Sequence, residues 1–109
     1  MLNITKRQVW VTFQKEGVHL YPAAKDDPLL ATGGADDVSF LGFAHRHIFH
    51  FKVAIDVFHD DRDIEIILLK RKINKYLNEM FPETFGEMSC EMIAKLLLNC
   101  FELSYCKVL

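Results

Sequence analysis

The stretch from Phe43 to Lys70, FAHRHIFHFKVAIDVFHDDRDIEIILLK, places the strongest constraint on how this chain can fold. In its first half, apolar side chains recur at every second position, at Phe49, Phe51, Val53, Ile55 and Val57. This period of two is typical of a β-strand that is buried on one face. The polar segment 59–63 ends the strand, and the sequence predicts a helix directly after it.

Before this stretch, the sequence predicts another strand and a loop. Residues 8–14 (QVWVTFQ) alternate in the same way, and Gly17 allows the chain to bend before residues 18–22. From Ala23 to Asp37 the composition changes to Asp, Pro, Gly and Ala, which predicts a long loop. Loops of this length in a small domain are usually functional or mobile.

After the central strand, the sequence predicts two helices and a short strand. Apolar residues recur at helical spacing from Ile66 to Met80, and Ser89 is placed to cap a second helix. Residues 103–109 alternate weakly as a third strand. Two helices that follow a long hairpin pack best on one face of an antiparallel sheet. We therefore predict one α+β domain over residues 1–109.

Length, charge and cysteine content exclude several classes of protein. A chain of 109 residues can build one modest core, and its net charge of −2 lacks the basic excess of a nucleic-acid-binding surface. Its apolar runs are far shorter than a membrane span. The three cysteines are an odd number without close spacing, which argues against a disulfide framework or a zinc knuckle. We expect a cytoplasmic protein that binds neither nucleic acid nor membrane.

The histidines at the start of the central strand suggest a metal site. His45 and His47 lie on the same face of the strand, about 6–7 Å apart along it, and can converge on one cation. A histidine-rich strand without any ligand would show the same pattern. His50 falls on the opposite face, so we interpret it as a surface or interface histidine.

Four motifs in order resemble the family of 6-pyruvoyltetrahydropterin and 6-carboxytetrahydropterin synthases. His19 in EGVHLYP is similar to the first zinc-binding histidine of that family, and His45 and His47 match its H-x-H pair. Segment 63–70 is similar to the family's helix-opening motif. Segment 88–94 (MSCEMIA) resembles its pterin-contacting P-T-S-E-N-x-A motif.

The resemblance implies a tunnelling fold, in which an antiparallel sheet carries two helices on one face and subunits join into a barrel. It implies zinc held by His19, His45 and His47, with Ser89, Cys90 and Glu91 facing a pterin-like substrate. The activity would be that of a carbon–oxygen lyase acting on a compound like dihydroneopterin triphosphate. Its assembly would be a homo-oligomer, either a trimer or a hexamer.

The sequence also departs from the family where catalysis is concerned. Segment 37–44 holds no cysteine where the synthases have a catalytic one, and segment 78–83 lacks the histidine of their Asp-His pair. The glutamate that holds the pterin ring in the family would follow Leu109. His59 could stand in as an acid or base because its ordinary pKa lies near neutrality, although a turn histidine is often merely solvated.

Cys90 is the other candidate catalytic residue, because the N-terminus of a helix stabilises a thiolate. A half-buried cysteine beside a capping serine would have the same sequence context. Two functions stay open at this point. One is a zinc-dependent pterin synthase with altered catalytic groups, and the other is a non-catalytic tunnelling-fold protein that binds a ligand or forms a structural oligomer.

Overall fold

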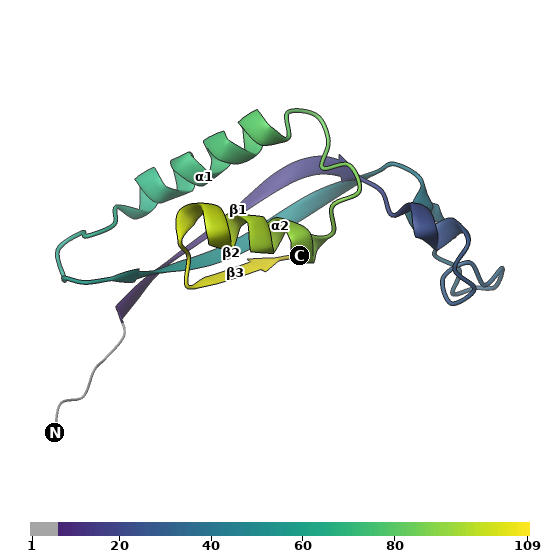
Figure 1. Cartoon of the computed structure of the whole chain (residues 1–109), viewed down its shortest axis with the longest axis horizontal. Helices are drawn as coiled ribbons and strands as arrows, with labels where there is room; N and C mark the ends of the chain where they lie inside the picture. Colours follow the sequence, from purple (N-terminus) through teal and green to yellow (C-terminus); the bar gives the residue numbers. More distant parts are fainter. Residues whose placement is uncertain (1–6) are drawn as a thin grey trace, which may run out of the picture.

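The computed structural model describes residues 7–109, which form a three-stranded antiparallel sheet with two helices on one face (Figure 1). The strands lie in the order β1 (Arg7–His19), β2 (His45–Val57) and β3 (Tyr105–Val108). The helices are α1 (Ile66–Met80) and α2 (Cys90–Phe101). This arrangement confirms the predicted α+β class and the order of its main elements, whereas the tunnelling fold stays a prediction.

The first strand is longer than the sequence predicted. It runs without a bend through Gly17 to His19, and it pairs with β2 in one register from Arg7↔Val57 to His19↔His45. The prediction of a bend at Gly17 was wrong. This glycine instead leaves room for Phe85, because an added Cβ would lie 2.7 Å from Cε2 of that ring. Residue 17 must be glycine because no side chain fits there, and its φ angle is not in the left-handed region that favours glycine.

The core lies between the sheet and the two helices. Phe49, Phe51 and Val53 alternate along β2 and are at most 2% exposed, as their period of two predicted. The buried residues of the helices recur at every fourth position, at Leu69, Ile73 and Leu77 in α1 and at Ile93 and Leu97 in α2. Burial of this apolar stripe holds both helices on the same face of the sheet.

Both helices begin at a side-chain cap. Glu65 accepts a hydrogen bond from the backbone N–H of Leu68 at 2.7 Å, and Ser89 accepts one from that of Met92 at 3.2 Å. Each cap satisfies one of the backbone donors that the first turn leaves without a partner. Within residues 7–109, neither helix is long and apolar enough to cross a membrane.

The segment between β1 and β2 extends past the end of the sheet (Figure 1). It contains two short 3₁₀-helices, η1 (Pro22–Lys25) and η2 (Ser39–Gly42), which the sequence did not predict. The carboxylate of Asp37 accepts hydrogen bonds from the backbone N–H groups of Gly33 and Ser39 and from the Ser39 hydroxyl. The hydroxyl of Ser39 contributes most to lowering the pKa of Asp37, and the two N–H groups lower it further.

Candidate metal centre and pocket

The three predicted metal-binding histidines lie together at one end of the sheet. His19 ends β1, His45 begins β2, and the two residues are direct partners in the register. The ring centroid of His19 lies 4.4 Å from that of His45 and 5.2 Å from that of His47. All three rings lie on the helix-bearing face, where His19 and His47 contact the buried ring of Phe49. His50 lies on the opposite face, as the alternation of the strand predicted.

The hydrogen bonds of the imidazoles suit metal ligation. Nδ1–H of His45 donates to the carbonyl of Phe43 at 2.9 Å, and Nδ1–H of His19 donates to that of Met88 at 3.3 Å. A carbonyl can only accept, so the proton of each neutral ring lies on Nδ1 and the lone pair on Nε2. Metal-binding histidines are usually oriented by such a bond. His19 and His45 therefore have the tautomer that a zinc ligand of this kind requires.

The rings do not converge as they stand. Within residues 7–109, no three His, Cys, Asp or Glu side chains are arranged to hold a metal ion. His19 lies near both other rings, so ligation of one ion would require the three side chains to change their rotamers. Burial lowers the pKa of His19, and the nearby His45 and His47 lower it further, while the bond to the Met88 carbonyl raises it. These effects together favour the neutral imidazole, which is the form that binds metals.

Next to the histidines lies a pocket of about 780 Å³, which is within the usual range for small-molecule sites. Its walls come from the end of β1, the loop after it and the start of α2. The lining residues are His19, Leu20, Tyr21, Pro22, Ala23, Leu41, His45, Glu87, Met88, Ser89, Cys90, Glu91 and Met92. The pocket thus brings two of the predicted zinc ligands together with all three predicted substrate-binding residues. His47 lies beside His19 but does not line the pocket.

The chain before α2 holds this helix against the end of β1. The backbone N–H of Phe85 donates to the carbonyl of Val18 at 2.8 Å, and that of Leu20 donates to the carbonyl of Gly86 at 2.9 Å. The Thr84 hydroxyl donates to the Val18 carbonyl as well. Gly86 has φ 61°, a left-handed conformation that glycine adopts easily. These bonds place the N-terminus of α2 beside His19, although the two lie far apart in the sequence.

Cys90 lines the pocket, but its thiolate is not stabilised as the sequence suggested. Burial raises the pKa of the Cys90 thiol, and the charge of the neighbouring Glu91 raises it further. At neutral pH the side chain is therefore mainly a thiol, which is a weak nucleophile and a weak base. Ser89 uses one lone pair of its hydroxyl for the cap, and its O–H can still donate toward the pocket.

His59 lies at the other end of the sheet, so the structure does not bring this predicted catalytic residue to the pocket. The 13-residue strand β2 separates it from His45, a span of roughly 40 Å. Its Nε2 lies 3.4 Å from the carboxylate of Asp63, and its Nδ1 accepts from the backbone N–H of Asp61. His59 therefore cannot reach the pocket of its own chain, because the whole length of β2 lies between them, and its catalytic role stays a prediction.

Several pocket residues could not be recognised from the sequence. Tyr21 and Leu41 reach the pocket because the backbone N–H of Tyr21 donates to the carbonyl of Leu41 at 2.6 Å, which closes the loop between β1 and β2. Met88 and Met92 form apolar walls on the α2 side. No periodic pattern marks such residues, since their positions depend on loop closure.

No protein-family model matches the sequence, and comparison with curated proteins finds no match. The resemblance to the pterin synthases therefore depends on the four motifs and on the geometry described above.

Proposed function

We propose that this protein is a zinc-dependent binder of a pterin-like heterocycle, of the kind that 6-pyruvoyltetrahydropterin and 6-carboxytetrahydropterin synthases represent. One observation carries the proposal: His19, His45, Ser89, Cys90 and Glu91 line a single pocket. Two motifs that resemble the family's zinc and pterin motifs meet there, although His19 and His45 lie far from Ser89 along the chain.

The residues have distinct roles in this proposal. His19, His45 and His47 would hold zinc, which when bound polarises a substrate hydroxyl or carbonyl group. Glu91 offers a carboxylate that can accept two N–H groups from the edge of a heterocycle. The Ser89 hydroxyl can donate to a ring nitrogen or carbonyl, and the methionine and proline side chains of the pocket form its apolar walls.

The same geometry argues against a normal rate of side-chain elimination. That reaction needs a positioned base, which typically contributes about 10²–10⁴-fold in rate. Cys90 has a raised pKa, and His59 lies at the far end of β2. A non-catalytic role in binding is therefore the second candidate function, and it is favoured because neither of the two predicted catalytic residues supplies a base in the pocket.

Pterin binding can be measured directly by the fluorescence of neopterin titrated with zinc-loaded protein. We expect saturable binding that weakens about tenfold in Glu91→Gln, the loss expected for one charge-assisted hydrogen bond. Glu83→Gln is a matched control, because Glu83 is exposed and does not line the pocket. Equal affinity of Glu91→Gln and the wild type would contradict the proposed pterin site.

We also propose that the protein is a homo-oligomer, a trimer or a hexamer, as in the resembling family. The radius of gyration is 17.7 Å, whereas a compact domain of this length has about 13 Å. In residues 7–109, β3 and most of β1 leave one edge unpaired, since only the end of β1 at His19 pairs with Gly86 there, and exposed edges tend to pair with other chains. Sedimentation at micromolar concentration should show a trimer or hexamer, and a stable monomer would refute the proposal.

A cytoplasmic location agrees with the state of the cysteines. Cys90, Cys100 and Cys106 are free thiols, as is usual in a reducing compartment. Fractionation of cells that express the full chain would test this location.

A further inference from the structure

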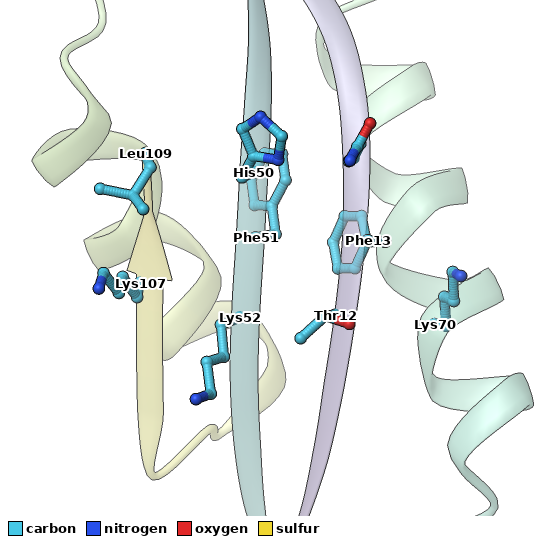
Figure 2. Close-up of a pocket in the computed structure, with 9 residues that line it drawn as sticks. Thr12, Phe13, His50, Phe51, Lys52, Lys70, Lys107 and Leu109 are labelled. Carbon is cyan, nitrogen blue, oxygen red and sulfur yellow. The ribbon is translucent and has the colours of Figure 1, made fainter.

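A basic hollow lies on the sheet face that carries no helix (Figure 2). Its volume is about 590 Å³, and it is open to solvent over the middle of the sheet. The polar residues that line it are Thr12, Gln14, His50, Lys52, Lys70 and Lys107. Those on the strands alternate with core residues such as Phe51 and therefore point away from the core. Lys70 lies on α1, beyond β1, at the edge of the hollow (Figure 2).

The register places like charges side by side in this hollow. Lys52 pairs with Thr12 on β1 and with Lys107 on β3, so these three residues form one row across the sheet. Like charges directly opposite each other on neighbouring strands destabilise a sheet. The ammonium of Lys52 lies 5.0 Å from the ring centroid of Trp10, whose π-face offsets part of this cost.

The acidic residues of this face do not neutralise the lysines. Glu16 forms an ion pair with Arg46 at 2.8 Å, and Asp56 accepts a hydrogen bond from Gln8 at 3.0 Å. Both pairs lie toward the ends of the sheet. Across residues 7–109, no ion pair within 4.0 Å involves Lys52, Lys70 or Lys107. The middle of this face is therefore cationic, although the whole chain has a net charge of −2.

We propose that this hollow binds a polyphosphate group. Lys107 on β3 and Lys70 on α1 lie on opposite sides of β2 and β1, a separation of at least two strand spacings or about 10 Å, so one phosphate cannot contact all three ammonium groups. A chain of phosphates can contact several of them in turn and relieve the repulsion between Lys52 and Lys107. Thr12, Gln14 and His50 add further hydrogen-bond donors on the same face. The sheet separates this hollow from the pocket at His19, so the two sites are distinct.

The probe for the first experiment is inorganic tripolyphosphate, titrated by calorimetry into protein that has been freed of metal with a chelator. The expected result is saturable binding that persists in His45→Ala, because the metal centre is not involved. The double variant Lys52→Gln, Lys107→Gln should bind about a hundredfold more weakly, about tenfold for each charged hydrogen bond. The control Lys72→Gln, Lys95→Gln removes the same charge from exposed helix positions and should bind as the wild type does.

A thermal measurement shows whether the variants are folded. Without ligand, Lys52→Gln should melt at the same temperature as the wild type or higher, because it removes a repulsion. Tripolyphosphate should raise the melting temperature of the wild type and of the control, but not of the double variant. Equal losses of affinity in the two double variants, or no saturable binding by the wild type, would overturn the proposal. Equal affinity for sulfate would overturn the preference for polyphosphate.

A comparison of ATP with tripolyphosphate distinguishes two sources of the same chemical group. Equal affinities would indicate that the hollow recognises the phosphates alone, as for inorganic polyphosphate. Binding of ATP more than tenfold tighter, with the gain lost in Trp10→Leu, would indicate a nucleoside triphosphate whose base stacks on that ring. Trp10 is the only tryptophan of the chain, and its side chain is 45% exposed, so its fluorescence reports occupancy independently.

Discussion

Gly17→Ala tests the packing that supports the candidate site. A Cβ at Gly17 would lie 2.7 Å from Cε2 and 2.8 Å from Cδ2 of Phe85, and 3.3 Å from Cε2 of Phe49. Phe85 is 3% exposed and Phe49 is 0% exposed, so neither ring can turn into solvent at little cost. The added methyl group must displace Phe85 and, with it, the segment that joins the start of α2 to the end of β1.

Two effects of this substitution have opposite signs. In an unstrained backbone, alanine in place of glycine stabilises by about 0.4–1 kcal/mol through the unfolded chain. Overpacking of a core costs about 1–3 kcal/mol. Contacts under 3.0 Å with a buried ring make the second effect larger. We expect a net loss of about 1–2 kcal/mol, and each kcal/mol lowers the melting temperature by about 4–8 °C in a domain of this size.

Circular dichroism during heating and urea denaturation measures this loss. Gly34→Ala is the control, because a Cβ there would lie no closer than 3.4 Å to Asp36, and it should change stability by less than about 0.5 kcal/mol. Phe85→Leu should recover part of the loss in the Gly17→Ala background. The reasoning would be refuted if Gly17→Ala were as stable as the control.

The remaining predictions concern the cap, the thiols and turnover. Ser89→Ala should cost about 1 kcal/mol by loss of the cap at α2, measured by urea denaturation, and should also weaken binding of neopterin. Alkylation followed by mass spectrometry should modify the exposed Cys100 well before Cys106. Burial raises the pKa of Cys106 to about 11, so the alkylation of Cys106 should accelerate as pH rises toward that value. Dihydroneopterin triphosphate should be turned over by zinc-loaded protein at least about a hundredfold more slowly than by a normal synthase, since segments 37–44 and 78–83 lack the family's catalytic cysteine and histidine. Turnover within tenfold of normal, abolished in His45→Ala, would show that a substitute base exists.

Periodicity predicted the parts of the fold that depend on burial. The alternation from Phe49 to Val57 identified β2, and the spacing of Leu69, Ile73 and Leu77 identified α1, because a buried face imposes its own period. Gly17 was misread as a bend because a glycine that makes room for a distant ring has the same appearance in sequence as one that turns the chain. Only the position of Phe85 in three dimensions distinguishes the two cases.

The candidate site was predictable to the extent that motifs marked it. The family resemblance placed His19 with His45, and the register of the long hairpin makes the two residues direct partners. The meeting of these histidines with Ser89, Cys90 and Glu91 depends on hydrogen bonds between β1 and the chain before α2, which no local pattern reveals. The basic hollow was missed for the same reason, since Lys52 and Lys107 become neighbours only through the register of β2 with β3.

The zinc content of purified protein after reconstitution with zinc and dialysis tests the proposed metal centre most directly. Elemental analysis should find one zinc ion per chain in the wild type, and little or none in His19→Ala or His45→Ala. His50→Ala should retain zinc, because it removes a histidine of the same strand from the opposite face of the sheet. A wild type without zinc, or a loss in His50→Ala equal to that in His45→Ala, would contradict the proposed centre.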